Sequence, residues 1–282
     1  MNMDGKIVLV TGASSGIGRA TAVGLAKQGA QLLIVGRTPA RCAEAVAAVH
    51  AAGDGRAQMI EADFSSLAGI RALADDVQTR VDRLDVLVNN AGTLARRRTL
   101  TADGYEATFA VNHLGYFLLT GLLLPVLRAA DRARIVTVAS EAHRAGPLDL
   151  DDLQSERDYG TMRVYSRSKT ANILWTQELA RRLDRSGITA NSLHPGVIRT
   201  NLARELGVGL GLAMGLAGLF MQSPEKGAET SIYLASSPDV EGLSGRYYDS
   251  SRERSPAAHA CDPTIARRLW DLSEELVDHA YP

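Results

Sequence analysis

The sequence predicts a single α/β domain in which helices cover both faces of a doubly wound parallel sheet. Strand-like and helix-like segments alternate from residue 6 to residue 193, and no linker or low-complexity segment interrupts them. Parallel strands need crossover connections, which place helices on the two faces of the sheet. With 282 residues, 45% of them hydrophobic, the chain is long enough to bury a large core.

Each expected strand is a short apolar run, and each expected helix is a longer segment that ends near glycine or a polar turn. Strands are expected at 6–11, 31–36, 57–61, 84–89, 134–139 and 188–193. Helices are expected at 20–28, 41–52, 67–81, 105–128, 164–183 and 263–277. The single domain thus covers residues 1–282, with a helical tail at about 263–282.

Composition excludes several classes of protein. A net charge of −1 argues against nucleic-acid binding, and the short basic run Arg96-Arg97-Arg98 is expected to be a solvated loop, with contact to an acidic substrate as the alternative. Two cysteines are too few for a disulfide framework and suit a reducing compartment. The six histidines lack metal-binding spacing. The N-terminal MNMDGK has no apolar stretch, so we expect a cytoplasmic protein with no signal peptide or membrane span.

The segment TGASSGIG, residues 11–18, directly follows the first expected strand and precedes a helix. Gly12 allows a tight turn, Gly16 lets the backbone approach a pyrophosphate, and Gly18 lets the helix pack closely. The N–H groups at the start of the helix then face negative charge, with Ser14, Ser15 and Ile17 completing the loop. This context indicates a Rossmann-type dinucleotide site, whereas a simple strand-to-helix turn is the alternative.

The end of the second strand indicates which dinucleotide binds. In such folds an acidic residue there usually bonds the adenosine ribose, but this strand ends Ile34-Val35-Gly36-Arg37. The Arg37 guanidinium suits a 2′-phosphate through charge-assisted hydrogen bonds, to which Ser14 and Arg19 could add contacts. The sequence therefore favours NADP(H) over NAD(H), unless Arg37 is an ordinary exposed arginine.

Tyr165 and Lys169 are four residues apart, so on a helix they share one face. A nearby ammonium lowers the pKa of a phenol from about 10, which would make the tyrosine a general acid or base. Taken alone, the pair is also typical of a solvated helix.

The motifs TGASSGIG, NNAG at 89–92, Asn112 in FAVNHLGYFLLT, Ser140 in RIVTVAS, Tyr165 with Lys169, and HPGVIRT at 194–200 occur in one order. In these motifs the chain resembles the short-chain dehydrogenase/reductases. The segments YSRSKTANILWTQELARRL and GRYYDSSRE are similar to the retinol dehydrogenase-like branch, which includes the WW-domain oxidoreductases. Microsomal members of that branch carry an N-terminal membrane segment, which is not expected here.

The resemblance implies four catalytic residues. Tyr165 would exchange a proton with the substrate oxygen, Lys169 would lower the pKa of Tyr165 and hold the nicotinamide ribose, and Ser140 would stabilise charge on the substrate oxygen. Asn112 would hold a water that links Lys169 to solvent. Where the branch often has two serines, this chain has Ala139-Ser140 and keeps the second hydroxyl.

The resemblance also implies further cofactor contacts. Asp63, followed by Phe64, would accept a hydrogen bond from the adenine amine, and His194 is expected to be structural. A third group lies at the ends of later strands and completes the predicted site: Asn90, Ala91, Gly92, Pro195, Gly196, Val197 and Thr200.

Between Glu205 and Glu225 the chain reads LGVGLGLAMGLAGLFMQSP, which is uncharged and rich in glycine. We expect a substrate lid over about 200–223, with a buried packing helix over 206–221 as the alternative. An apolar lid predicts an apolar substrate.

The predicted function is therefore an NADP(H)-dependent oxidoreductase that interconverts a carbonyl and an alcohol by hydride transfer. A non-catalytic NADPH-sensing scaffold that binds a protein partner is the alternative, and a structural interaction module would need no glycine loop. The resemblance also suggests a homodimer or homotetramer.

Overall fold

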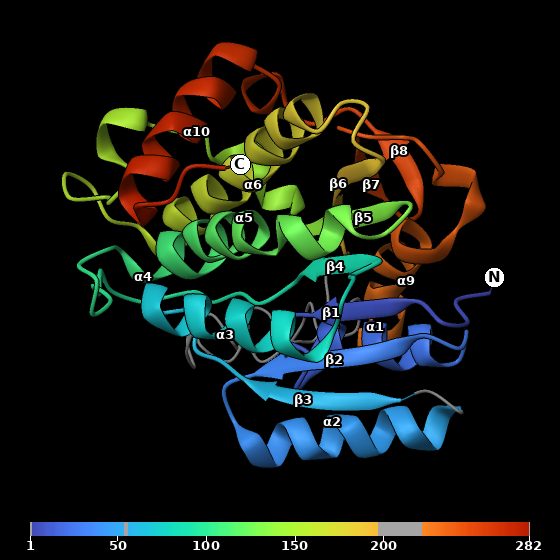
Figure 1. The fold of residues 1–282 in the computed structure, drawn as a ribbon. Helices are drawn as coiled ribbons and strands as arrows, with labels where there is room; N and C mark the ends of the chain where they lie inside the picture. Colours follow the sequence, from blue (N-terminus) through green and yellow to red (C-terminus); the bar gives the residue numbers. More distant parts are fainter. Residues whose placement is uncertain (1, 54–55, 197–221, 282) are drawn as a thin grey trace.

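A computed structural model describes residues 2–53, 56–196 and 222–281. Within these residues the chain forms one sheet in the order β3-β2-β1-β4-β5-β6-β7-β8, with helices on both faces, which confirms the predicted fold class (Figure 1). The strands span Ile7–Val10 (β1), Gln31–Gly36 (β2), Ala57–Glu61 (β3), Val86–Asn89 (β4), Ala133–Val138 (β5), Ile188–His194 (β6), Tyr247–Asp249 (β7) and Arg252–Arg254 (β8).

The helices follow the predicted alternation, although α1, α2 and α6 begin two to four residues earlier than expected. They span Gly16–Ala26 (α1), Pro39–Ala52 (α2), Leu67–Arg80 (α3), Ala107–Phe109 (α4), Gly115–Arg128 (α5), Thr161–Arg182 (α6), Pro224–Ser236 (α9) and Pro263–Val277 (α10). Short 3-10 helices cover Glu141–Ala145, Leu150–Asp152, Pro238–Val240 and Ala258–Ala260. Helix α9 and strands β7 and β8 were not predicted from the sequence.

Alternating strand side chains build two cores, one on each face of the sheet. Leu9 and Leu33 join the core formed with α3, α5, α6 and α10, whereas Val8 and Leu32 join the core formed with α1, α2 and α9. The C-terminal helix α10 lies against α6 in the first of these layers (Figure 1). The same strands therefore contribute side chains to both cores, one on each face of the sheet.

The sheet is not wholly parallel, because β8 pairs with β7 in the antiparallel sense. The two strands are joined by Ser250 and Ser251, whose φ angles of 52° and 57° both lie in the left-handed region. A two-residue turn with two positive φ angles matches the twist of a hairpin, but asparagine and glycine usually occupy it. A pair of serines gives little sequence signal for such a turn.

The helix expected at 105–128 is not continuous. Glu106 precedes α4 and accepts hydrogen bonds from the N–H groups of Thr108 and Phe109, and residues Ala110–Leu114 then form a π-helical turn before α5. Such turns occur mostly at functional sites. The segment Ala107–Arg128 is also long and apolar enough to cross a membrane, but 89% of its most apolar window is buried inside the protein, as in a core helix.

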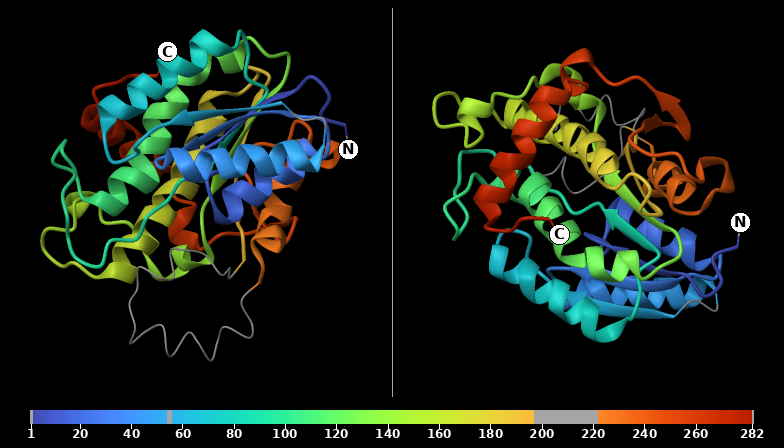
Figure 2. Two further views of the ribbon diagram at one scale, coloured as in Figure 1. Left: turned by 90° about the horizontal axis from the view of Figure 1, so that it is seen from below. Right: turned by 45° about the horizontal axis from the view of Figure 1, so that its top comes forward.

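The strand order reverses between β1, which pairs with β2, and β4, which pairs with β5. In open α/β sheets the ligand binds at this position, beyond the carboxyl ends of the strands. The two further views in Figure 2 show the helices packed on both sides of the sheet. The loops after β1, β4, β5 and β6 are therefore positioned to build one site.

Candidate active site

A pocket of about 550 Å³ lies at the carboxyl ends of the central strands. Its volume is in the range of cofactor and substrate sites. Nearly every predicted site residue that the structure describes lines it, namely Gly12, Ser14, Ser15, Gly16, Ile17, Gly18, Arg37, Asp63, Phe64, Asn90, Ala91, Gly92, Ser140, Tyr165, Lys169, Pro195 and Gly196. Asn112 is not among the lining residues, and Val197, Thr200 and the predicted lid at 200–221 lie outside the described residues.

The glycine loop has the geometry that its sequence predicts. Gly12 and Gly16 have φ angles of 64° and 57°, which favour glycine. A Cβ atom on Gly12 would lie 2.8 Å from the Ala91 Cα, and one on Gly18 would lie 2.5 Å from the Gly12 carbonyl oxygen. Ser15 precedes α1 without a side-chain capping bond, so the first N–H groups of the helix are left for a ligand.

Thr11 joins this loop to the turn after β4. Its hydroxyl oxygen accepts hydrogen bonds from the N–H groups of Asn90 (2.8 Å) and Ala91 (3.0 Å). The Asn90 amide in turn donates to the Thr11 carbonyl oxygen at 2.7 Å. Asn90 therefore holds the two loops together through its side chain, and Thr11, which was not predicted as a site residue, fixes the spacing of the phosphate cradle.

The end of β2 has no room for a carboxylate. A Cβ atom on Gly36 would lie 2.8 Å from both the Cys42 Sγ and the Ser14 Cβ. Arg37 and, four residues later, Arg41 line this end of the pocket, and neither guanidinium is paired with a carboxylate in the described part of the chain. Arg41 was not predicted as a site residue. Its position in the first turn of the helix expected at 41–52 was the signal that could have indicated it.

Asp63, the residue expected to contact the adenine, lies at the pocket wall. Asp63 is exposed there, and its carboxylate accepts a hydrogen bond from the Ser65 N–H at 3.0 Å, while the neighbouring Phe64 side chain is buried. This hydrogen bond fixes the carboxylate and leaves its second oxygen for a ligand.

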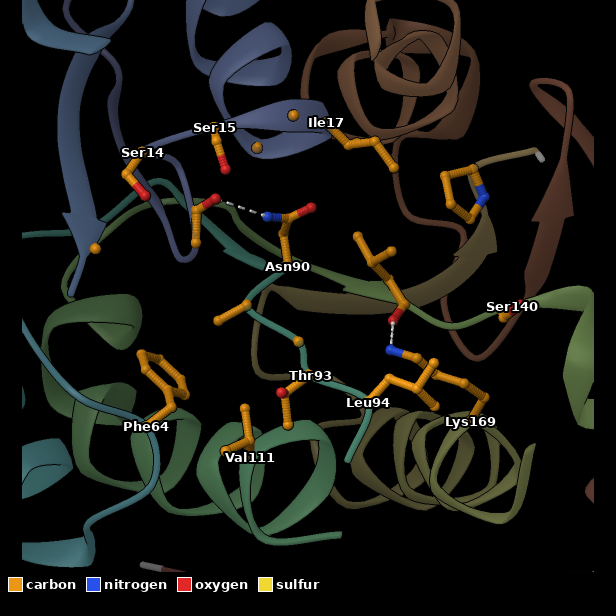
Figure 3. A pocket seen from close by; sticks show the side chains of 18 of the residues that line it. Ser14, Ser15, Ile17, Phe64, Asn90, Thr93, Leu94, Val111, Ser140 and Lys169 are labelled. Atoms are coloured by element: carbon orange, nitrogen blue, oxygen red, sulfur yellow. Dashed lines mark hydrogen bonds between the residues drawn. The ribbon is translucent and has the colours of Figure 1, made fainter. Parts of the chain in front are cut away.

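Three predicted catalytic side chains meet at the same pocket. Tyr165 and Lys169 lie on one face of α6, and Ser140 follows β5. Figure 3 shows Lys169 and Ser140 at the pocket. The Lys169 Nζ donates to the Val138 carbonyl oxygen at 2.9 Å and lies 5.6 Å from the centre of the Tyr165 ring. The Ser140 hydroxyl oxygen accepts from the Ala142 N–H at 3.2 Å, which begins the 3-10 helix that follows. The hydroxyl hydrogen of Ser140 is left for another partner.

The titration of the pair differs from the sequence expectation. Burial raises the pKa of Tyr165, and only the hydrogen bond with Ser140 lowers it. Burial also lowers the pKa of Lys169 to about 7, because a desolvated ammonium is unfavourable. The expected depression of the Tyr165 pKa by Lys169 is therefore not seen here. The Lys169 Nζ donates instead to the Val138 carbonyl oxygen.

Asn112 lies behind the pocket wall, in the π-helical turn. Its Oδ1 accepts from the Thr93 N–H at 2.8 Å, and its Nδ2 donates to the Thr93 carbonyl oxygen and the Ser168 hydroxyl, both at 3.1 Å. The side chain thus clamps the segment after Gly92 to α6. The water-mediated contact with Lys169 stays a prediction.

Several lining residues had little sequence signal. Leu94, Glu141, Ala142, Met162 and His194 belong to the pocket. His194 was expected to be structural, and its Nδ1 accepts a hydrogen bond from the Glu141 N–H at 3.2 Å, while burial lowers its pKa. These residues come from the loop after β4, the 3-10 helix after β5, the first turn of α6 and the end of β6, which only the fold brings together.

Comparison with known proteins agrees with this geometry. Residues 6–209 match the family model described as short chain dehydrogenase. The chain is 47% identical to mouse (Mus musculus) retinol dehydrogenase 14, over 98% of this chain and 86% of that protein. It is 41% identical to mouse polyprenol dehydrogenase, over 94% of this chain and 82% of that protein.

Solved structures show the same fold. A crystal structure of an uncharacterized protein from Mycobacterium Paratuberculosis has a TM-score of 0.82 and 33% identity, covering 100% of this chain and 96% of that one. The complex of Pseudomonas aeruginosa RhlG with NADP has a TM-score of 0.72 and 28% identity, covering 92% and 98% of the two chains. With its glycine loop, its Tyr165 and Lys169 pair and these matches, the chain belongs to the short-chain dehydrogenase family, among retinol dehydrogenase-like oxidoreductases.

Proposed function

We propose that this protein is an NADP(H)-dependent oxidoreductase that interconverts an apolar carbonyl compound and its alcohol. The observation that carries the proposal is the convergence of Ser140, Tyr165 and Lys169 on one pocket with the glycine loop. A sensor or scaffold would need the loop alone, so the three polar side chains favour catalysis.

In this mechanism the phenol of Tyr165 donates its proton to the carbonyl oxygen during reduction and accepts it back during oxidation. The Ser140 hydroxyl donates a hydrogen bond to the same oxygen and stabilises the negative charge that develops on it. The nicotinamide ring of the cofactor supplies or accepts the hydride. Lys169, at the base of the pocket, holds a proton that can replace the one lost from Tyr165.

The residues of the pocket fit a dinucleotide. The close approach of Gly12 and Gly18 to backbone atoms and the uncapped start of α1 favour a pyrophosphate. At the other end, the steric exclusion of a side chain from Gly36, together with Arg37 and Arg41, supports a cofactor with a 2′-phosphate. The NADP complex of a structural relative supports the same choice.

The substrate class rests on the pocket and on the relatives. Leu94, Ala142 and Met162 add apolar surface near Ser140 and Tyr165. The names of two curated relatives specify retinol and polyprenol, which are both long apolar isoprenoid alcohols. We therefore propose an isoprenoid or similarly apolar primary alcohol and its aldehyde as the substrate pair.

The test follows NADPH absorbance with a homologous series of aliphatic and isoprenoid aldehydes. The apparent kcat/KM is expected to rise with each added methylene until the pocket is full, because each buried methylene lowers the activation free energy by about 0.8 kcal/mol. Tyr165→Phe keeps the ring and removes the hydroxyl, so kcat is expected to fall by about two orders of magnitude or more. NADPH binding, measured by fluorescence, is expected to stay within about threefold.

Tyr159→Phe is the matched control, because its hydroxyl donates to the Ala95 carbonyl oxygen and the residue does not line the pocket. Binding of NADPH without turnover of any aldehyde would favour the sensor. Retention of most of the activity by Tyr165→Phe would contradict the mechanism, and a flat chain-length profile would contradict the substrate class.

A further inference from the structure

His143 is a fully buried histidine three residues after Ser140. Its Nδ1 lies 2.7 Å from the Ser140 carbonyl oxygen, and its Nε2 lies 3.0 Å from the Ala257 amide nitrogen. A backbone N–H can only donate, so Nε2 is the acceptor and the ring proton is on Nδ1. The neutral imidazole therefore donates to Ser140 and accepts from Ala257 at the same time.

The backbone around His143 is joined to the catalytic helix. The carbonyl oxygen of His143 lies 2.9 Å from the His259 Nε2. The Thr170 hydroxyl, which has one hydrogen to donate, lies 2.7 Å from the Gly146 carbonyl oxygen and 3.1 Å from the His143 carbonyl oxygen, both in the turn after β5. Thr170 directly follows Lys169 on α6. At the end of the same turn, a Cβ atom on Gly146 would lie 2.5 Å from the Ser166 carbonyl carbon and Cβ. The turn after β5 thus rests against α6 beside both Tyr165 and Lys169.

We propose that His143 is a positioning residue for the reaction, and that its Nδ1–H bond to the Ser140 carbonyl sets where the Ser140 hydroxyl meets the substrate oxygen. The inference rests on the proposed function. Ser140 and Tyr165 come from different elements, so their hydroxyls converge only if the turn is held in place relative to α6. The Nδ1–H group donates its hydrogen bond to Ser140 itself, whereas Nε2 accepts its hydrogen bond from Ala257 in the C-terminal segment.

The two ring nitrogens can be tested separately, because an asparagine amide reaches the position of Nδ1 and a glutamine amide reaches that of Nε2. His143→Asn keeps a donor to the Ser140 carbonyl, and we expect its kcat to stay within about threefold of the unmodified enzyme. His143→Gln keeps only an acceptor for Ala257, and we expect its kcat to fall about tenfold to a hundredfold. For both variants, KM and the NADPH dissociation constant should change by less than about threefold. His50→Gln, at an exposed position on α2, is the control.

The double variant separates positioning from general stability. In a Ser140→Ala background no hydroxyl is left to position, so adding His143→Gln is expected to lower kcat by less than about twofold. Equal losses of kcat in His143→Asn and His143→Gln would overturn the proposal and make His143 a structural residue. So would an undiminished loss of kcat when His143→Gln is added to the Ser140→Ala variant. Absence of turnover in the unmodified enzyme would instead overturn the proposed function and this inference with it.

Discussion

At the scale of single residues, burial is the largest cause of the pKa shifts of Tyr165, Lys169 and His194 in the pocket. Lys169 is 4% exposed, and its pKa falls to about 7. In the unfolded chain a lysine titrates near about 10.4. The folded protein therefore binds fewer protons between these two values, so the stability of the cofactor-free enzyme rises with pH across this window and is lowest below pH 7.

Lys169→Met removes this ionisable group and, with it, the pH dependence that the group gives to the stability of the protein. The free energy of unfolding of the variant relative to the unmodified protein should decrease by about 2 to 3 kcal/mol between pH 7 and pH 9. The measurement is urea unfolding of the cofactor-free proteins at several pH values. Lys27→Met removes an exposed lysine, and its relative stability should stay constant over that range. A constant difference for Lys169→Met would show that the ammonium stays charged in the fold.

The proposed preference for NADPH also rests on single residues, namely Arg37 and Arg41. Arg37→Ala and Arg41→Ala should each reduce the preference for NADPH over NADH, and together they should reduce it about tenfold to a hundredfold. Arg252→Ala, which removes an exposed arginine on β8 outside the pocket, is the control. The dissociation constants are measured by fluorescence titration with both cofactors. Equal constants in the unmodified enzyme would contradict the NADP assignment.

A carboxylate introduced at Gly36 is a poor test of the same idea, because its Cβ would collide with Cys42 and Ser14. Loss of binding in such a variant would report the collision and not the preference. Substitutions at Arg37 and Arg41 avoid this problem, since both side chains are exposed.

At the scale of elements, the site depends on close contacts between an element and the loop or turn beside it. Gly18 of α1 packs on the Gly12 carbonyl, and Gly146 packs on the backbone of α6. Each of these two contacts exists because one partner has no side chain. The π-helical turn is a further feature of this kind, because it carries Asn112, which bonds Thr93 after β4.

Gly146→Ala should push the turn after β5 away from α6. Its Cβ would lie 2.5 Å from Ser166, so we expect a loss of about 1 to 3 kcal/mol of stability and a lower kcat with NADPH binding retained. Thermal unfolding and single-turnover rates measure the two effects. Gly160→Ala is the matched control, because its Cβ would contact only the Arg163 Cβ at 3.6 Å. If the two variants behave alike, the contact with α6 is not needed to hold Ser140.

At the scale of the whole molecule, one sheet joins the two cores and carries the pocket at its carboxyl edge. Helix α10 completes the core on the α6 side. Trp270 packs against Phe117 with ring centres 5.1 Å apart, and the Tyr281 hydroxyl donates to the Phe117 carbonyl oxygen at 2.6 Å. The Arg182 guanidinium of α6 lies 4.2 Å from the Trp270 ring. The C-terminal segment therefore supports the helix that carries Tyr165 and Lys169.

The sequence by itself predicted the fold class, most element positions and most of the residues that line the pocket. The elements, the glycine loop and the pair of Tyr165 and Lys169 have local signals, namely apolar runs, glycines at tight turns, and a tyrosine and a lysine one helical turn apart, whereas Asp63, Asn112 and Ser140 were implied by the family resemblance. The β2, β3 and α10 segments were predicted at their observed bounds for this reason. The role of Arg37 could also be predicted, because Gly36, at the position where such folds usually have an acidic residue, is next to it in the sequence.

Only the tertiary structure decided the features that depend on packing between distant segments. The depressed pKa of Lys169 comes from burial under several elements, and the serine hairpin between β7 and β8 has no strong local signal. Thr11 acquires its contacts when the loops after β1 and β4 meet, and His143 when the turn after β5 meets the segment at Ala257. Arg41 reaches the pocket only because α2 begins beside the end of β2. Sequence patterns report what a segment prefers by itself, whereas desolvation and hydrogen-bond geometry depend on which other segments surround it.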